Sequence, residues 1–165
     1  MLNGLERLLG ALSDGINKIS IYLIGIIVGL MITIITAQVI LRYGFNSGFS
    51  WAEEVTIFLM AWMTFLGSAI ALKRSEHINV DVVVDRLPHP LQFIVLIIGK
   101  LLVLTFAIVF LYYGYNFVAS STNFYSNALR IPLWIPRSSI VVAFIIMIIH
   151  LLHSIVKDFA EVSRR

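Results

Sequence analysis

The sequence contains no cysteine and is poor in charge, because aspartate, glutamate, lysine and arginine make up only 13% of its 165 residues. The absence of cysteine excludes disulfides, thiolate metal sites and cysteine nucleophiles. Soluble globular domains carry about 25% charged residues, so half of the usual complement is missing. The net charge is +3, and the basic residues stand at the ends of apolar segments, which argues against nucleic-acid binding. These shortages indicate that lipid surrounds most of the chain.

Hydrophobic residues make up 59% of the sequence and gather in long runs. Four runs are long enough to cross a bilayer, at about 19–41, 51–72, 91–115 and 136–156. The first has 23 residues without a charge, about 34 Å as a helix. It is too long for the core of a signal peptide, so we expect it to be retained. The predicted fold is an all-α integral membrane protein, a single membrane domain over 1–165, with the other helices packed around the second span.

Residues 1–18 precede the first span and form an amphipathic pattern. Leucine and isoleucine recur there at steps of three and four, and most of the charged residues fall on the other side. This pattern is typical of a helix that lies in the plane of the membrane interface. We therefore expect an N-terminal interfacial helix. The connection 73–90 predicts a short surface helix that ends at two prolines.

The basic residues near the span ends predict the orientation of the chain. The segments 1–18, 73–90 and 157–165 carry eight lysines and arginines, whereas the opposite side carries three, Arg42, Arg130 and Arg137. Because cytoplasmic segments are enriched in basic residues, we expect both termini in the cytoplasm and the first and third connections outside.

Small residues mark one face of each of the first two spans. On the first span they recur every four residues at Gly25, Gly29, Thr33 and Ala37, and on the second they stand at Ala61, Thr64, Ser68 and Ala71. Small side chains allow close helix packing in lipid. We therefore expect both stripes to be buried inside the bundle. The bulky stripe of Phe58, Trp62 and Phe65 then faces outward, toward either lipid or a partner subunit.

Charged residues at the mouth of the first two spans form the sharpest candidate site. Arg42 ends the first span, and Glu53 and Glu54 follow Trp51 at the start of the second. A carboxylate in a membrane helix is a candidate for ion coupling. We favour the alternative that Arg42 and the two glutamates clamp the helix ends together at headgroup depth.

Three further polar side chains lie within or near the later spans. Lys100 has no acidic residue at matching depth in another predicted span. It therefore snorkels to the cytoplasmic headgroups, the third helix enters the bilayer late, or a partner supplies an acceptor, and we favour the first two. His150 and His153 are interpreted as interfacial residues, with haem ligation as the alternative. The sequence has no phosphate loop, nucleophile triad or metal-spaced cluster, so we do not expect an enzyme.

Several motifs together resemble one transporter family. They are Arg42-Tyr43-x-Phe45-Asn46, Trp51-x-Glu53-Glu54, Trp62-x-x-Phe65-Leu66-Gly67, His77-Ile78-x-Val80-Asp81 and Ile131-Pro132-Leu133-Trp134. With Arg74 preceding it, the His77 to Asp81 run forms a cytoplasmic-loop motif. In this combination the sequence is similar to the small membrane subunit of tripartite ATP-independent periplasmic (TRAP) transporters.

The resemblance implies a non-catalytic scaffold subunit in the bacterial inner membrane. Its implied partners are a large multi-span membrane subunit that carries sodium and moves as an elevator, a periplasmic substrate-binding protein, and membrane lipids. No cofactor is expected in this chain. The implied substrates are organic acids of the dicarboxylate or sialic acid type. Two alternatives remain from the residues alone: a haem-binding membrane anchor of a respiratory oxidoreductase, and a small transporter or channel that works by itself.

Overall fold

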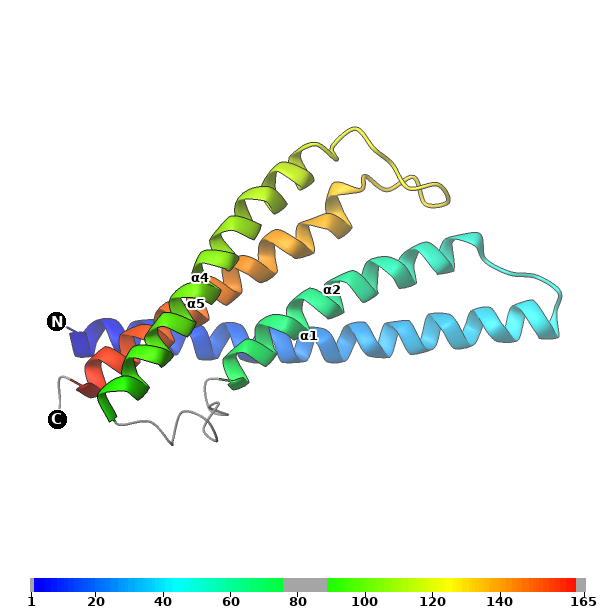
Figure 1. Cartoon of the computed structure of the whole chain (residues 1–165). Coiled ribbons are helices and arrows are strands. Elements are labelled where there is room, and N and C mark those ends of the chain that lie inside the picture. The colour runs from blue at the N-terminus through cyan, green and yellow to red at the C-terminus, as the bar shows by residue number, and fades with distance from the viewer. Residues whose placement is uncertain (1, 76–88, 163–165) are drawn as a thin grey trace.

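Four long helices account for most of the computed structural model, which describes residues 2–75 and 89–162 (Figure 1). They are α1 (Leu2–Gly44), α2 (Ser50–Ser75), α4 (His89–Ala119) and α5 (Trp134–Val162). Each contains a stretch long and apolar enough to cross a membrane. The prediction of an all-α fold with four helices able to span a membrane is therefore confirmed. Every helix extends beyond its predicted span at both ends, because helical structure continues past the apolar run into the polar residues beside it.

The N-terminal amphipathic stretch continues into the first span without a break. Helix α1 runs over 43 residues as one element, about 64 Å long. Ser13 and Ser20, which belong to its first half, are buried at 0% and 3% exposure. The structure thus shows a continuous helix where the sequence pattern predicts a separate one, and the placement of residues 1–18 in the interface plane stays a prediction.

The helices pair as two hairpins that converge near the chain termini and diverge toward their loops (Figure 1). One hairpin is α1–α2 and the other is α4–α5, and both termini lie at the converging end. Helix α5 packs against all three other helices. The prediction that the bundle is organised around the second span is therefore wrong, because α5 is the helix that joins the two hairpins.

The main core cluster lies where α1, α2 and α5 meet. Its buried members are Ile27 of α1, Leu66 and Ala69 of α2, and Ile146 of α5. Helix α4 approaches α5 closely at Gly114, where an added Cβ would lie 2.9 Å from Ile140 Cγ2. Most other large apolar side chains are exposed, as expected for helices whose solvent is lipid.

Candidate functional site

The end of the bundle opposite the termini is called here the outer end, after the predicted orientation. It holds the charged residues at the mouth of the first two spans. Arg42 Nη1 and Glu53 Oε1 are 3.9 Å apart, and the two side chains are 64% and 69% exposed. This contact joins α1 to α2 as predicted, but an exposed pair at this distance contributes only about 0–1 kcal/mol. Trp51 stacks on Phe49 with 5.3 Å between ring centroids.

Glu54 does not take part in that contact and instead binds the connection between α4 and α5. Its two carboxylate oxygens accept hydrogen bonds from the backbone N–H groups of Ala128 and Leu129, at 2.8 and 3.0 Å. The predicted three-residue clamp is therefore wrong for Glu54. Successive residues on a helix point about 100° apart, so Glu53 faces α1 while Glu54 faces the other hairpin.

The connection between α4 and α5, residues 120–133, is called here the outer loop. Tyr125 and Pro132 form an antiparallel bridge, and Ser126 N–H donates to the Ile131 carbonyl at 2.9 Å. At the base of the loop, Arg137 donates to Ser121 Oγ. The loop is thus an ordered element, and Glu54 fixes it to the start of α2, where Figure 1 shows the loop reaching across.

A groove of about 290 Å³ lies below the outer loop, between α2 and α5. Phe58 and Phe65 line its α2 wall, and Pro136 and Ile140 belong to its α5 wall. Trp62 packs against the core cluster. The aromatic stripe therefore faces α5 within this chain, and the prediction that it faces outward is wrong.

The small-residue seam of α1 lies on the surface of the bundle. Gly25, Gly29, Thr33 and Ala37 are all exposed. A Cβ added at Gly25 or Gly29 would meet no atom within 4 Å. On α2, Thr64, Ser68 and Ala71 are exposed as well. The prediction that these stripes are buried inside the bundle is wrong, because the helices turn their larger apolar residues inward. Helix packing by the α1 seam stays a prediction that would need a partner helix.

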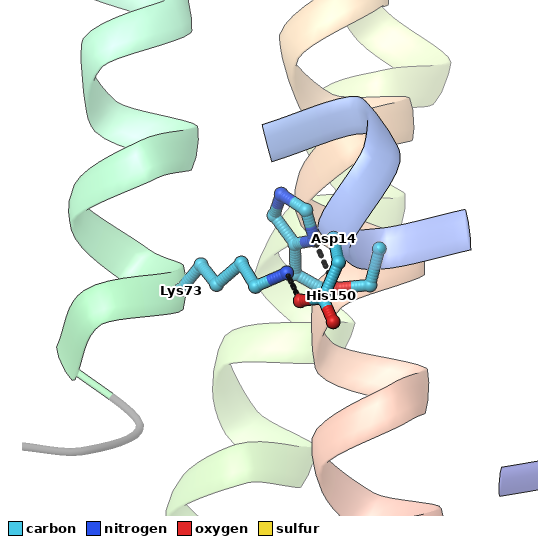
Figure 2. Close-up of polar contacts among 4 residues, drawn as sticks. Asp14, Lys73 and His150 are labelled. Carbon is cyan, nitrogen blue, oxygen red and sulfur yellow. Dashed lines mark hydrogen bonds and ion pairs between the residues drawn. The ribbon is translucent and has the colours of Figure 1, made fainter. Parts of the chain in front are cut away.

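Polar contacts between helices gather near the converging end. Lys73 of α2 reaches Asp14 of α1 with 2.6 Å between Nζ and Oδ1, and Figure 2 shows this pair beside His150 of α5. Lys73 is 8% exposed. Ser13 Oγ and His150 Nδ1 form a hydrogen bond of 2.8 Å. These contacts join α1 to both α2 and α5.

Lys100 has an acidic partner within this chain. Its Nζ lies 2.5 Å from Asp158 Oδ2, and the side chains are 21% and 24% exposed. The expectation that no acidic residue lies at matching depth is therefore wrong, whereas snorkelling of Lys100 and late entry of the third helix stay predictions. Asp158 belongs to α5, which continues to Val162 instead of ending near residue 156, and this extension brings the carboxylate opposite Lys100.

The two histidines of the fourth span belong to the contact between α1 and α5. His150 is completely buried, so its interpretation as an interfacial residue is wrong. His153 lies against Gly10, where an added Cβ would be 3.1 Å from His153 Nε2. Within the described part of the chain, no three histidine, aspartate or glutamate side chains are placed to hold a metal ion.

The cytoplasmic-loop motif is described only at its first residue. Arg74 is exposed near the end of α2, whereas His77 and Asp81 lie outside the described residues, as does the predicted surface helix. The sequence alone did not identify the partners of His150, Lys73 and Lys100, which are Ser13, Asp14 and Asp158. The signal for Asp158 was its position four residues after Ser154, which places it on a buried face of the same helix.

Comparison with known proteins gives consistent matches along the chain. The family described as "Tripartite ATP-independent periplasmic transporters, DctQ component" matches residues 31–161. The C4-dicarboxylate TRAP transporter small permease protein DctQ of Vibrio cholerae is 34% identical over 108 residues, which cover 66% of this chain and 45% of that protein.

Two further relatives differ in their named substrates. The isethionate TRAP transporter permease protein DctMQ of Oleidesulfovibrio alaskensis is 32% identical over 133 residues, which cover 76% of this chain and 21% of that protein. The sialic acid TRAP transporter small permease protein SiaQ of Vibrio cholerae is 36% identical over 59 residues, which cover 36% of this chain and 34% of that protein. The chain spans less than half the length of each of these three relatives.

Proposed function

The chain belongs to the DctQ component family of tripartite ATP-independent periplasmic transporters, and from this premise we propose that it is the non-catalytic scaffold subunit of a sodium-coupled organic-acid importer. Membership makes it a component of a transporter in the inner membrane rather than an enzyme. It also removes the alternative of a haem-binding anchor for a respiratory oxidoreductase.

The distribution of charge supports a scaffold role and carries the proposal. The charged side chains of the described helices lie near the two ends of the bundle, and long uncharged stretches separate the charges: 18 residues between Glu54 and Lys73, and 29 between Lys100 and Arg130 in the outer loop. At the converging end, two lysines pair with carboxylates of other helices, Lys73 with Asp14 and Lys100 with Asp158. These residues hold the bundle together, so we place sodium and substrate in a partner subunit.

The proposed partners are a large multi-span membrane subunit and a periplasmic substrate-binding protein. The family name describes a tripartite, periplasmic transporter. A transporter of three components needs two more proteins besides this chain. The chain covers only 21% of DctMQ, whose name combines the letters of two components. We propose that the large partner resembles the remainder of that protein. This partner would move against the present chain as an elevator.

The proposed substrate is an organic acid of the dicarboxylate or sialic acid type. Relatives that match this chain carry names with C4-dicarboxylate, isethionate and sialic acid. Because similar small subunits accompany different named substrates, we assign the choice of substrate to the other components. This assignment agrees with a chain whose charged residues tie helices to one another.

The proposed orientation places both termini in the cytoplasm, and it can be tested by labelling. Cysteines introduced at Ser47 and Asn123, which are both exposed, should react with an impermeant thiol reagent in intact cells, because the outer end then faces the periplasm. A cysteine at Asn3 should react only after the membrane is opened. Labelling of Asn3→Cys in intact cells would reverse the orientation.

The scaffold role can be tested by reconstitution of the transporter with and without this chain. The large subunit, this chain and the binding protein together should take up the organic acid under a sodium gradient. Uptake should fall to background when this chain is omitted or when the gradient is removed. Flux from vesicles that contain this chain alone would instead make it a transporter in its own right.

A further inference from the structure

A polar hollow of about 520 Å³ lies at the outer tip of the α1–α2 hairpin. Gln38 and Arg42 from the last turns of α1 line one side, Asn46 comes from the connection, and Ser50 and Glu53 come from the first turn of α2. Nearly all of these side chains are hydrogen-bonding groups, at the end of two helices whose neighbouring stretches are apolar. The hollow is therefore chemically different from the lipid-facing surface around it.

Two opposite charges stand in the wall of this hollow without satisfying each other. Arg42 Nη1 and Glu53 Oε1 lie 3.9 Å apart, which is beyond hydrogen-bond distance, and the side chains are 64% and 69% exposed. A guanidinium has five N–H donors, and a carboxylate can accept several hydrogen bonds. Both groups thus keep most of their capacity for a ligand that carries an anion and a cation close together.

Aromatic side chains place the hollow at the depth of lipid headgroups. Phe49 and Trp51 stack on each other at its rim, and Tyr43 and Phe45 beside it are 83% and 72% exposed. Exposed aromatic rings of this kind gather at the membrane–water interface. A membrane lipid is therefore the molecule that meets this hollow at the highest concentration.

We propose that this hollow binds the headgroup of a zwitterionic phospholipid of the phosphatidylethanolamine class. The phosphate accepts hydrogen bonds from Arg42, and the ammonium donates to Glu53 and to an amide oxygen of Gln38 or Asn46. Phosphatidylglycerol offers a phosphate but leaves Glu53 without a cation. Phosphatidylcholine offers a cation that has no N–H to donate. This proposal does not depend on the scaffold role, because it concerns only the tip of one hairpin.

Native mass spectrometry of the full chain in detergent, titrated with each of the three lipids, tests the proposal. Phosphatidylethanolamine should bind about tenfold more tightly than the other two, because the extra hydrogen bonds are charge-assisted. Arg42→Gln should weaken binding of phosphatidylethanolamine and phosphatidylglycerol alike. Glu53→Gln should remove the preference between these two lipids. Arg130→Gln, on an outer-loop arginine outside the hollow, is the matched control and should change nothing.

Equal binding of all three lipids to the unaltered chain would overturn the proposal, because it would describe ordinary lipid contact with an apolar surface. Unchanged affinity for phosphatidylethanolamine in Arg42→Gln, or an unchanged preference between the two lipids in Glu53→Gln, would also overturn it. Both side chains are mostly exposed, so the variants should fold, and the lipid ranking of the unaltered chain provides a test that needs no variant. Uptake assays on the assembled transporter report separately on the scaffold role.

Discussion

The ion pair of Lys100 and Asp158 should contribute more to the free energy of unfolding than any other ion pair described in this chain. The two charged atoms are 2.5 Å apart, and the side chains are 21% and 24% exposed. Removing one member of a fully buried pair costs about 3–5 kcal/mol, since a charge remains without compensation, whereas exposed pairs contribute about 0–1 kcal/mol. A pair that is about three-quarters buried lies between these limits. We expect Lys100→Met or Asp158→Asn to lower the free energy of unfolding by about 2–3 kcal/mol.

A double-mutant cycle separates the pair from its surroundings. The double variant of Lys100→Met and Asp158→Asn should be little less stable than either single variant, giving a coupling energy of about 2 kcal/mol. The assay is reversible unfolding in mixed micelles, followed by far-ultraviolet circular dichroism. Arg42→Gln and Glu53→Gln provide the matched control, because that pair is 3.9 Å apart and mostly exposed. Its coupling should stay below about 1 kcal/mol.

Two results would refute this reasoning. A neutral Lys100→Met variant would mean that the ammonium reaches the headgroups by itself, as the sequence alone suggests. A coupling between Lys100 and Asp158 no larger than that of the outer pair would mean that burial within the bundle does not strengthen the contact.

Three other predictions concern close packing, a buried hydrogen bond and the outer loop. Gly114→Ala should destabilise the protein by about 1–3 kcal/mol, because its Cβ would lie 2.9 Å from an isoleucine methyl group. Gly25→Ala, where the added Cβ meets open space, should be neutral or stabilising, and equal effects of the two changes in unfolding assays would contradict the packing. Ser13→Ala should cost about 1–3 kcal/mol by leaving a buried histidine nitrogen without its partner, and an unchanged unfolding midpoint would argue against that bond. Glu54→Gln should increase the mobility of a spin label in the outer loop, because an amide side chain offers one acceptor oxygen in place of two; the same change in Glu53→Gln would show that the effect is not specific.

The positions of the spans could be predicted because the length of an uncharged run is a direct physical requirement of the bilayer. Their ends were less predictable. Lys157 closes the apolar run of the fourth span, although α5 continues to Val162. The prediction therefore placed Asp158 in a tail, and Lys100 was left without a partner.

The inward faces of the helices could not be read from the sequence for a different reason. Lipid tails are as apolar as leucine, so a side chain facing lipid and one facing another helix have similar hydrophobicity. The alternation of polar and apolar faces that orients a helix in a soluble protein is missing here. The small-residue rule then assigned the seam at Gly25 and Gly29 to the interior, whereas Ile27 is the residue that the fold buries.

The candidate site was predicted correctly in location but not in its connections. The motif from Arg42 to Glu54 does lie at one end of the bundle, since both residues flank uncharged spans. Which partner each glutamate takes depends on a rotation of about 100° between adjacent helical positions and on the path of the outer loop. The backbone N–H groups of Ala128 and Leu129 carry no signature in the sequence, because every residue other than proline has one.

The bond between Glu54 and the outer loop has a mechanical consequence. Two helical hairpins that are joined only at one end can change the angle between them easily when a force acts on the other end. Because the loop spans the open side and Glu54 fastens it to α2, the hairpins and the loop together form a closed triangle. The angle between the hairpins can then change only if the loop stretches or the bonds to Glu54 break. The resistance of the bundle to a change in this angle therefore depends in part on one carboxylate and two backbone amides.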